Sequence, residues 1–350
     1  MNGGSTLADP LAHASVPWQR QLASAVRDVD ELWRLLALPE AYRAQAKAAA
    51  GAFPLLVPQA FLSRMEPGNL HDPLLQQVLP LGAELESPEG FSADPLAEGG
   101  CSPVSGLLHK YQGRALLVST PACAIHCRYC FRRHYPYQEV ERRGPWWRPA
   151  LAYIAQHPEI VELLLSGGDP LTLPDAVLEA LIREAEVIPH VRRVRFHTRL
   201  PVVLPARIDD AFLAMLGRRS VAVVMVIHAN HPREFDGAVQ EACQRLRRAG
   251  VTLLNQSVLL RGVNDAVETL VELSERMFQA GVLPYYLHVL DRVAGAAHFL
   301  RTDHDAFALH QALAARLPGY LVPRLVREEP GAPGKTLLTN PKTAEISRPA

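Results

Sequence analysis

The sequence is short of cysteine, of net charge and of long apolar stretches, and each shortage excludes a class of protein. Only five of its 350 residues are cysteines. That is too few for a disulfide-stabilised secreted fold, so we expect a reducing, cytoplasmic setting. The 36 basic residues match the 36 acidic ones, so charge favours neither nucleic acid nor an anionic membrane as partner. No apolar run reaches the roughly 18–20 residues of a membrane span, and the N-terminus lacks signal-peptide features.

Three of the five cysteines are clustered. Cys123, Cys127 and Cys130 have the spacing C-x3-C-x2-C. Thiolates at this spacing can converge on one side of a short loop and hold an iron–sulfur cube by three of its irons. The fourth iron then stays open, and an open metal position can bind a small molecule and do chemistry. The alternative is a zinc site completed by Cys101 or a nearby histidine, but zinc loops usually pair two C-x2-C units and the sequence has no second pair.

From residue 114 onward, short apolar runs alternate with amphipathic stretches of helix length. Runs suited to buried parallel strands lie at 115–119, 160–165, 193–197, 221–227, 251–259 and 282–289. Amphipathic stretches lie at 175–186, 207–217, 233–249, 265–280 and 303–316. Alternating strands and helices predict a parallel sheet with right-handed crossovers. Six such units predict an α/β fold built as a partial (β/α)6 barrel.

The first 105 residues follow a different pattern. Residues 28–38 and 40–50 carry apolar side chains at helical spacing, whereas residues 66–105 are rich in Pro, Gly, Asp and Ser and favour ordered loops. We therefore divide the chain into three parts, which are a mostly helical N-terminal extension at 1–105, a partial barrel at 106–325 and a C-terminal loop and tail at 326–350.

Polar residues stand where the predicted strands end, and β/α barrels form their active sites at the C-terminal ends of strands. Strand 115–119 leads into the cysteine loop, and strand 160–165 into Ser166-Gly-Gly-Asp-Pro170, whose glycines allow the backbone to approach a ligand closely. The remaining strand ends carry His197-Thr-Arg199, His228-Ala-Asn-His231, Asn255-Gln-Ser257, and His288 with Asp291. The alternative for roughly half of these groups is that they satisfy buried backbone atoms.

Lysine is scarce, and one lysine stands in an unusual segment. The chain has four, namely Lys47, Lys110, Lys335 and Lys342. Lys335 follows a Pro- and Gly-rich stretch that begins at Arg327 and can present an amine to a pocket. A neutral, partly desolvated lysine can form an imine with an aldehyde cofactor such as pyridoxal 5′-phosphate (PLP). The alternative is an ordinary solvated lysine.

Together these motifs resemble the lysine 2,3-aminomutase family of radical S-adenosylmethionine (SAM) enzymes. The resemblance covers about residues 50–340 and rests on the segments 72–78, 106–111, 121–134, 166–171, 255–261, 284–291 and 334–336. It implies an isomerase in which Cys123, Cys127 and Cys130 hold a [4Fe–4S] cluster whose open iron binds SAM. It also implies a reductant such as flavodoxin or ferredoxin. Lys335 is then the lysine that binds PLP, and the implied SAM contacts are Gly167, Gly168, Asp169 and Gln256.

The resemblance also implies how L-lysine would be bound. Arg132 matches the arginine that pairs with the substrate carboxylate, and a bidentate guanidinium suits that task. Asp291 matches the first of two aspartates that hold the substrate ε-ammonium. At the second of these positions, seven residues before Lys335, this chain has Glu328. The charge is kept on a longer side chain, so we expect weaker recognition of free lysine than in the catabolic enzymes.

Within that family the chain looks closest to the branch that serves elongation factor P. Those enzymes make (R)-β-lysine from (S)-α-lysine, and a lysyl ligase then attaches it to elongation factor P. The segments 131–137, 286–291, 295–299 and 319–328, and the short stretch that follows Lys335, carry this likeness. The alternatives are a catabolic lysine 2,3-aminomutase, an aminomutase for another amino acid such as glutamate, and a non-enzymatic iron–sulfur or zinc protein.

Overall fold

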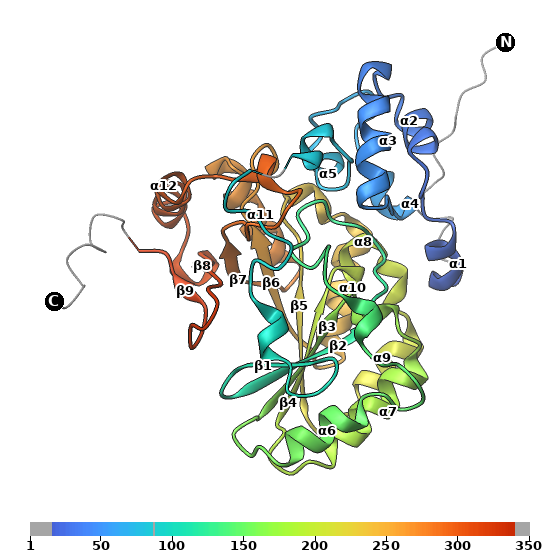
Figure 1. The fold of residues 1–350 in the computed structure, drawn as a ribbon, viewed down its shortest axis with the longest axis vertical. Helices are drawn as coiled ribbons and strands as arrows, with labels where there is room; N and C mark the ends of the chain where they lie inside the picture. Colours follow the sequence, from blue (N-terminus) through green and yellow to red (C-terminus); the bar gives the residue numbers. More distant parts are fainter. Residues whose placement is uncertain (1–15, 87, 340–350) are drawn as a thin grey trace.

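The apolar runs of the sequence form the strands of one open sheet, which occupies the centre of the molecule (Figure 1). The computed structural model describes residues 16–86 and 88–339. Within these ranges nine strands follow one another across the sheet in sequence order. They are β1 (Leu107–Tyr111), β2 (Arg114–Thr120), β3 (Glu162–Gly167), β4 (Arg193–Thr198), β5 (Ala222–Ile227), β6 (Thr252–Val258), β7 (Leu283–His288), β8 (Arg324–Arg327) and β9 (Thr336–Leu337).

The pairing of the strands confirms the predicted fold class and extends it. Strands β2 to β8 pair in parallel, and the six predicted strands correspond to β2–β7. Strands β1 and β9 pair antiparallel at the two edges, so the described sheet is not closed. The prediction missed β8 because its four residues, Arg-Leu-Val-Arg, form no apolar run. β8 crosses the proposed boundary at residue 325, and residues 340–350 of the proposed tail lie outside the described ranges.

Helices cover the outer side of this sheet, as the crossover rule requires. In α7 the buried side chains Leu178, Leu181, Ile182 and Ala185 recur at helical spacing and join the same core as the strands. The helices of this part are α6 (Arg148–Ala155), α7 (Asp175–Glu186), α8 (Leu200–Val203), α9 (Asp210–Leu216), α10 (Gly237–Arg248), α11 (Val267–Gln279) and α12 (Asp303–Ala314). Among the described helices, none is both long and apolar enough to cross a membrane.

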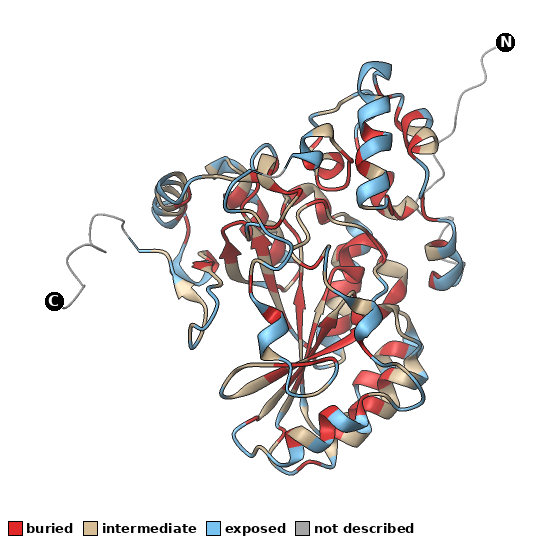
Figure 2. Cartoon of the chain, in the orientation of Figure 1, coloured by how far each residue is buried: buried red, intermediate tan, exposed pale blue. Residues whose placement is uncertain are grey.

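The N-terminal extension packs as short helices beside one end of the sheet (Figure 1). They are α1 (Trp18–Ala23), α2 (Val29–Leu36), α3 (Arg43–Ala52), α4 (Gln59–Leu62) and α5 (Pro73–Gln76). Buried residues form the inner faces of these helices as well as the sheet (Figure 2). Leu32 and Trp33 of α2 belong to the same hydrophobic cluster as Leu163 and Leu165 of β3, so the core continues across the proposed boundary at residue 105. The three-part division stays a prediction.

Short 3-10 helices complete the secondary structure and shape several loops around the strand ends. They span Glu40–Tyr42, Gly82–Leu85, Glu98–Cys101, Tyr137–Glu139, Pro170–Thr172, Pro205–Arg207, Pro232–Glu234, Ala297–Phe299 and Gly319–Leu321.

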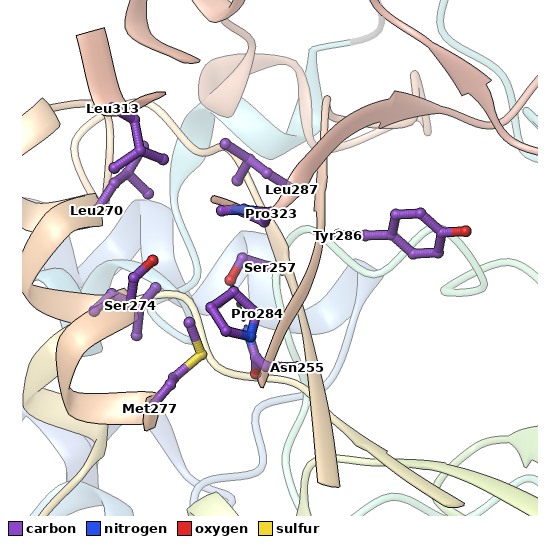
Figure 3. Close-up of a pocket in the computed structure, with 11 residues that line it drawn as sticks. Asn255, Ser257, Leu270, Ser274, Met277, Pro284, Tyr286, Leu287, Leu313 and Pro323 are labelled. Carbon is purple, nitrogen blue, oxygen red and sulfur yellow. Dashed lines mark hydrogen bonds between the residues drawn. The ribbon is translucent and has the colours of Figure 1, made fainter. Parts of the chain in front are cut away.

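The two faces of β6 and β7 have different surroundings. Asn255 and Ser257 point toward α11 and line a small cavity of about 10 Å³, enough for one water molecule at most (Figure 3). The Tyr286 side chain points away from the other labelled residues. Because side chains alternate along a strand, Gln256 and His288 face the same interior as Tyr286. This interior is the side on which Lys335 lies, with its Nζ atom 5.5 Å from the centre of the Tyr286 ring.

Candidate active site

The cysteine loop begins where β2 ends and places three thiols at the C-terminal edge of the sheet. Cys123, Cys127 and Cys130 are all half-buried and free. Burial, with some repulsion from the neighbouring thiol charges, raises the pKa of Cys123 well above its usual value and that of Cys130 to about 11. Metal binding has to displace these protons, because only thiolates are ligands.

The three cysteines form a donor set suited to an iron–sulfur cube. Among the described residues, no three His, Cys, Asp or Glu side chains gather closely enough to hold one metal ion. A cube has no such requirement, because each thiolate binds a different iron. The donor set of three thiols on one loop therefore fits the cluster implied by the sequence.

Buried arginines surround this loop, and the N-terminal extension supplies a partner for each of them. Glu84 pairs with Arg128 at 2.5 Å and with Arg133 at 2.9 Å. Glu98 accepts two hydrogen bonds from Arg132, at 2.7 and 2.8 Å. The segment before the barrel is thus part of the site, since it neutralises the cations of the cysteine loop in a region where an unpaired charge would be very unfavourable.

Gly167 and Gly168 pack the end of β3 against the start of the cysteine loop. A side chain at Gly168 would lie 2.3 Å from the Ala122 carbonyl oxygen, and one at Gly167 would lie 2.9 Å from the Thr120 carbonyl oxygen. Gly167 also has a φ of +109°, which favours glycine. Both glycines therefore let two backbones approach each other. Their contact with SAM stays a prediction.

The structure uses Asp169 as a tie between β3 and β4. Its carboxylate accepts hydrogen bonds from the Thr198 hydroxyl and the Arg199 amide, both at 2.7 Å, and from the amides of Leu171 and Leu200. Burial raises the Asp169 pKa to about 6 despite these donors. Four donors leave little capacity for a ligand, so the geometry supports a structural role more directly than the predicted SAM contact.

Among the predicted SAM contacts, Gln256 has a side-chain oxygen without a hydrogen-bond partner. Its Oε1 atom is buried and has no hydrogen-bond partner among the described residues. The Nε2 atoms of His197, His228 and His288 are in the same condition. Buried polar atoms are normally paired, so four orphans around one interior indicate that a ligand completes them. Asn255 differs, because it bonds the backbone of residue 229 and Ser257.

Electrostatics shows that the groups from distant strands share one interior. Burial, together with the charges of Arg199, Lys335 and Arg132, lowers the pKa of His228 to about 3. The pKa of His197 is lowered well below its usual value by burial and by the surrounding cations. The cations of the cysteine side and Lys335 therefore act on the same neutral histidines.

Lys335 lies at the other side of this interior, just before β9. Its ammonium donates to Glu328 Oε2 at 2.7 Å, and the ammonium of Lys110 donates to Glu328 Oε1 at 2.8 Å. Burial alone would raise the Glu328 pKa, but the two lysines outweigh it and hold the pKa well below its usual value. Glu328 is thus a carboxylate that already binds ammonium groups. Among the other lysines, Lys47 pairs with Asp30 in the N-terminal extension, and Lys342 lies outside the described residues.

Asp291 follows β7 and carries an unused carboxylate. Within the described ranges this carboxylate has no hydrogen-bond partner, while burial and the charge of Glu328 raise its pKa to about 7. Arg132 differs, because its fork is already held by Glu98, and its remaining bond is to the Ser166 hydroxyl at 3.2 Å. The structure therefore joins Glu328 and Lys335 directly, and the charges of both also act on Asp291.

The sequence prediction missed several residues of this interior. Glu98 was assigned only to a loop, although it holds Arg132. Tyr111 has a buried hydroxyl without a partner, and the Arg114 guanidinium stacks on its ring at 4.2 Å. The Pro- and Gly-rich composition around Glu98 indicates only a loop. The half-buried Tyr111 ends a short, partly polar strand, which does not signal a buried hydroxyl. An unpaired hydroxyl, a cation and an amine close to one another form a donor set that fits a phosphorylated aldehyde such as PLP.

Known proteins share both the sequence and its motifs. Residues 117–274 match the Radical SAM superfamily. The L-lysine 2,3-aminomutase of Escherichia coli (strain K12) is 50% identical over 322 residues, covering 92% of this chain and 94% of its own length. That of Haemophilus influenzae is 48% identical over 329 residues, covering 94% and 97%. That of Clostridium subterminale is 36% identical over 321 residues, covering 91% and 77%.

Proposed function

Because this chain belongs to the L-lysine 2,3-aminomutase family, a family of isomerases that carry a radical SAM domain, we propose that it converts (S)-α-lysine to (R)-β-lysine. One observation carries the assignment of substrate. Two carboxylates, Asp291 and Glu328, share the interior with the Lys335 amine, and the charge of Glu328 also acts on the Arg132 guanidinium. This distribution of charge complements an amino acid with a cationic end and an anionic end.

The residues present fit three cofactors. Cys123, Cys127 and Cys130 would hold a [4Fe–4S] cluster, the orphaned Gln256 carbonyl would contact SAM, and Lys335 would hold PLP. When bound, the cluster and SAM supply a radical that removes hydrogen, and PLP supplies a carrier for the migrating amino group. An external reductant of the flavodoxin or ferredoxin type would deliver the electron, and we place the activity in the cytoplasm.

The chain's own groups bind and orient the substrate. The carboxylate of lysine approaches the Arg132 guanidinium, which Glu98 holds in a fixed orientation at 2.7 and 2.8 Å. The ε-ammonium approaches Asp291, whose carboxylate has no partner of its own among the described residues. Glu328 keeps the Lys335 amine in place until the amine is needed. The neutral histidines His197, His228 and His288 add no positive charge to this interior.

We further propose that the product serves elongation factor P. The motifs shared with that branch and the longer Glu328 side chain support this assignment over catabolic turnover. Glu328 already carries two ammonium partners, Lys110 and Lys335, which weakens its pull on a third. A lysyl ligase would then attach (R)-β-lysine to elongation factor P.

The test is anaerobic reconstitution with iron and sulfide, followed by incubation with lysine, SAM, PLP and dithionite. Chiral analysis should detect (R)-β-lysine, and adding the ligase and elongation factor P should raise the mass of elongation factor P by one lysyl group. Absence of any β-lysine from protein that holds a cluster would refute the aminomutase assignment. Abundant (S)-β-lysine, or rapid turnover with no transfer to elongation factor P, would favour the catabolic alternative.

A further inference from the structure

One buried cation contacts a cysteine of the proposed cluster directly. The Arg199 Nη1 atom donates to Cys127 Sγ at 2.8 Å. Arg199 follows β4 and is only 5% exposed. Among the described residues, this thiol is the only hydrogen-bond acceptor of Nη1. No second acceptor of Nη1 therefore accounts for the position of this nitrogen.

The rest of the guanidinium is locked in place from two directions. Nη2 donates to Glu234 Oε2 at 3.0 Å and to Gln77 Oε1 at 2.5 Å. Glu234 and Gln77 are fully buried and bond each other at 3.1 Å. Gln77 comes from the N-terminal extension and Glu234 from the loop after β5, so three parts of the chain fix the position of Arg199.

Glu234 is the carboxylate partner of Arg199 in this network. Glu234 Oε1 is shared by the amides of Asn230 and His231 and by Gln77, so its charge is spread over several donors. The Gln77 carbonyl is neutral, and a neutral thiol is a weak acceptor. A thiolate bound to iron supplies a second negative partner and makes the Nη1 bond charge-assisted.

We propose that Arg199 is a positioning residue of the iron–sulfur centre, which holds the Cys127 ligand and makes the cluster easier to reduce. This inference rests on the proposed function, because it assumes that Cys127 binds the cluster. Reduction adds one electron, supplied by the external reductant, and so increases the negative charge on the sulfurs. A fixed cation and hydrogen-bond donor at one sulfur stabilises the reduced form more than the oxidised form, since outer contacts to the sulfurs tune the potential.

The test is the midpoint potential of the reconstituted cluster, followed by electron paramagnetic resonance, in Arg199→Gln and Arg199→Lys. Arg199→Gln removes both the charge and the guanidinium fork. When the solution is held at one fixed potential, the ratio of reduced to oxidised cluster in this variant should fall about tenfold or more. For a one-electron couple, a tenfold fall corresponds to a midpoint potential lower by about 59 mV. Arg199→Lys keeps the charge and should fall between this variant and the wild type.

Arg207→Gln is the matched control. Arg207 is also fully buried and pairs with Asp175 at 2.5 Å, but it donates to the Leu171 carbonyl and contacts no cysteine. Its loss should leave the potential of the cluster unchanged.

The outcomes separate this inference from the proposed function. If wild-type protein assembles no cluster, the proposed function fails and the inference fails with it. If it assembles one and Arg199→Gln has the wild-type potential, only the inference is wrong. If Arg199→Gln does not retain iron, the midpoint potential of Arg199→Lys decides instead. A wild-type potential in Arg199→Lys overturns the inference. So does a shift in Arg207→Gln that is as large as the shift in the Arg199 variants.

Discussion

The two halves of the interior differ in how completely their polar groups are bonded. On the cysteine side, the Asp169 carboxylate has four donors and Arg132 has three bonds to Glu98 and Ser166. On the lysine side, the Tyr111 hydroxyl and His288 Nε2 are buried without a described partner. Groups with several bonds hold one another in place, whereas unpaired groups indicate where ligands complete the structure. The first half is therefore a framework and the second half a binding surface.

The largest effect should come from removing a ligand of the cluster. Cys130→Ala should abolish cluster assembly, because two thiolates cannot hold three irons of a cube. Iron per chain and charge-transfer absorption after anaerobic reconstitution provide the measurement. Cys101→Ala and Cys243→Ala are the controls, since neither residue belongs to the loop, and both should keep the cluster. Iron loss in either control would contradict the assignment of the cluster to the three cysteines of this loop.

On the lysine side, Lys335→Ala should remove the PLP adduct that borohydride traps, without loss of iron. Lys335 bonds only Glu328 among the described residues, so its removal leaves the framework intact. Peptide mapping of the reduced adduct provides the measurement. Lys47→Ala, which affects only a surface pair with Asp30, should keep full labelling. An adduct on Lys110 would reassign the site.

A smaller effect is expected where the framework itself is broken. Glu98→Gln should lower the free energy of unfolding by about 3–5 kcal/mol, because it leaves the buried Arg132 without its counter-charge. Urea unfolding measures this loss. Glu40→Gln instead removes a carboxylate that is itself 73% exposed from the half-buried Arg43, and it should change stability little. Equal effects of the two substitutions would show that the cysteine side is no more rigid than the surface.

Asp291→Asn, which leaves Glu328 in place, should lower kcat/KM for lysine strongly. Removing one member of a desolvated charge pair costs about 2–5 kcal/mol, or roughly 30- to 5,000-fold in kcat/KM for lysine. The pKa of Asp291 is raised to about 7, so its charged form increases as the pH rises through that value. Since the lysine ammonium stays charged there, kcat/KM of the wild type should rise over the same range. A rise of the same size in Asp291→Asn would assign it to another group.

The sequence determined those features that depend on local pattern. Six apolar runs predicted β2–β7, the period of residues 175–186 predicted α7, and the spacing of Cys123, Cys127 and Cys130 predicted one loop at the end of β2. The apolar period and the cysteine spacing each depend on residues that are close together in the sequence, so both could be predicted from the sequence.

Only the tertiary structure decided which polar residues bond each other. The sequence separation is 34 residues between Glu98 and Arg132, 122 between Gln77 and Arg199, and 218 between Lys110 and Glu328. No local pattern encodes such pairs, because each depends on the register of the sheet and on how the extension packs against it. The same reason explains why the bonds of Asp169 to residues of β4 and to the residues that follow it could not be predicted, while its contact with SAM stays a prediction. A buried carboxylate takes whichever donors the folded chain brings within reach.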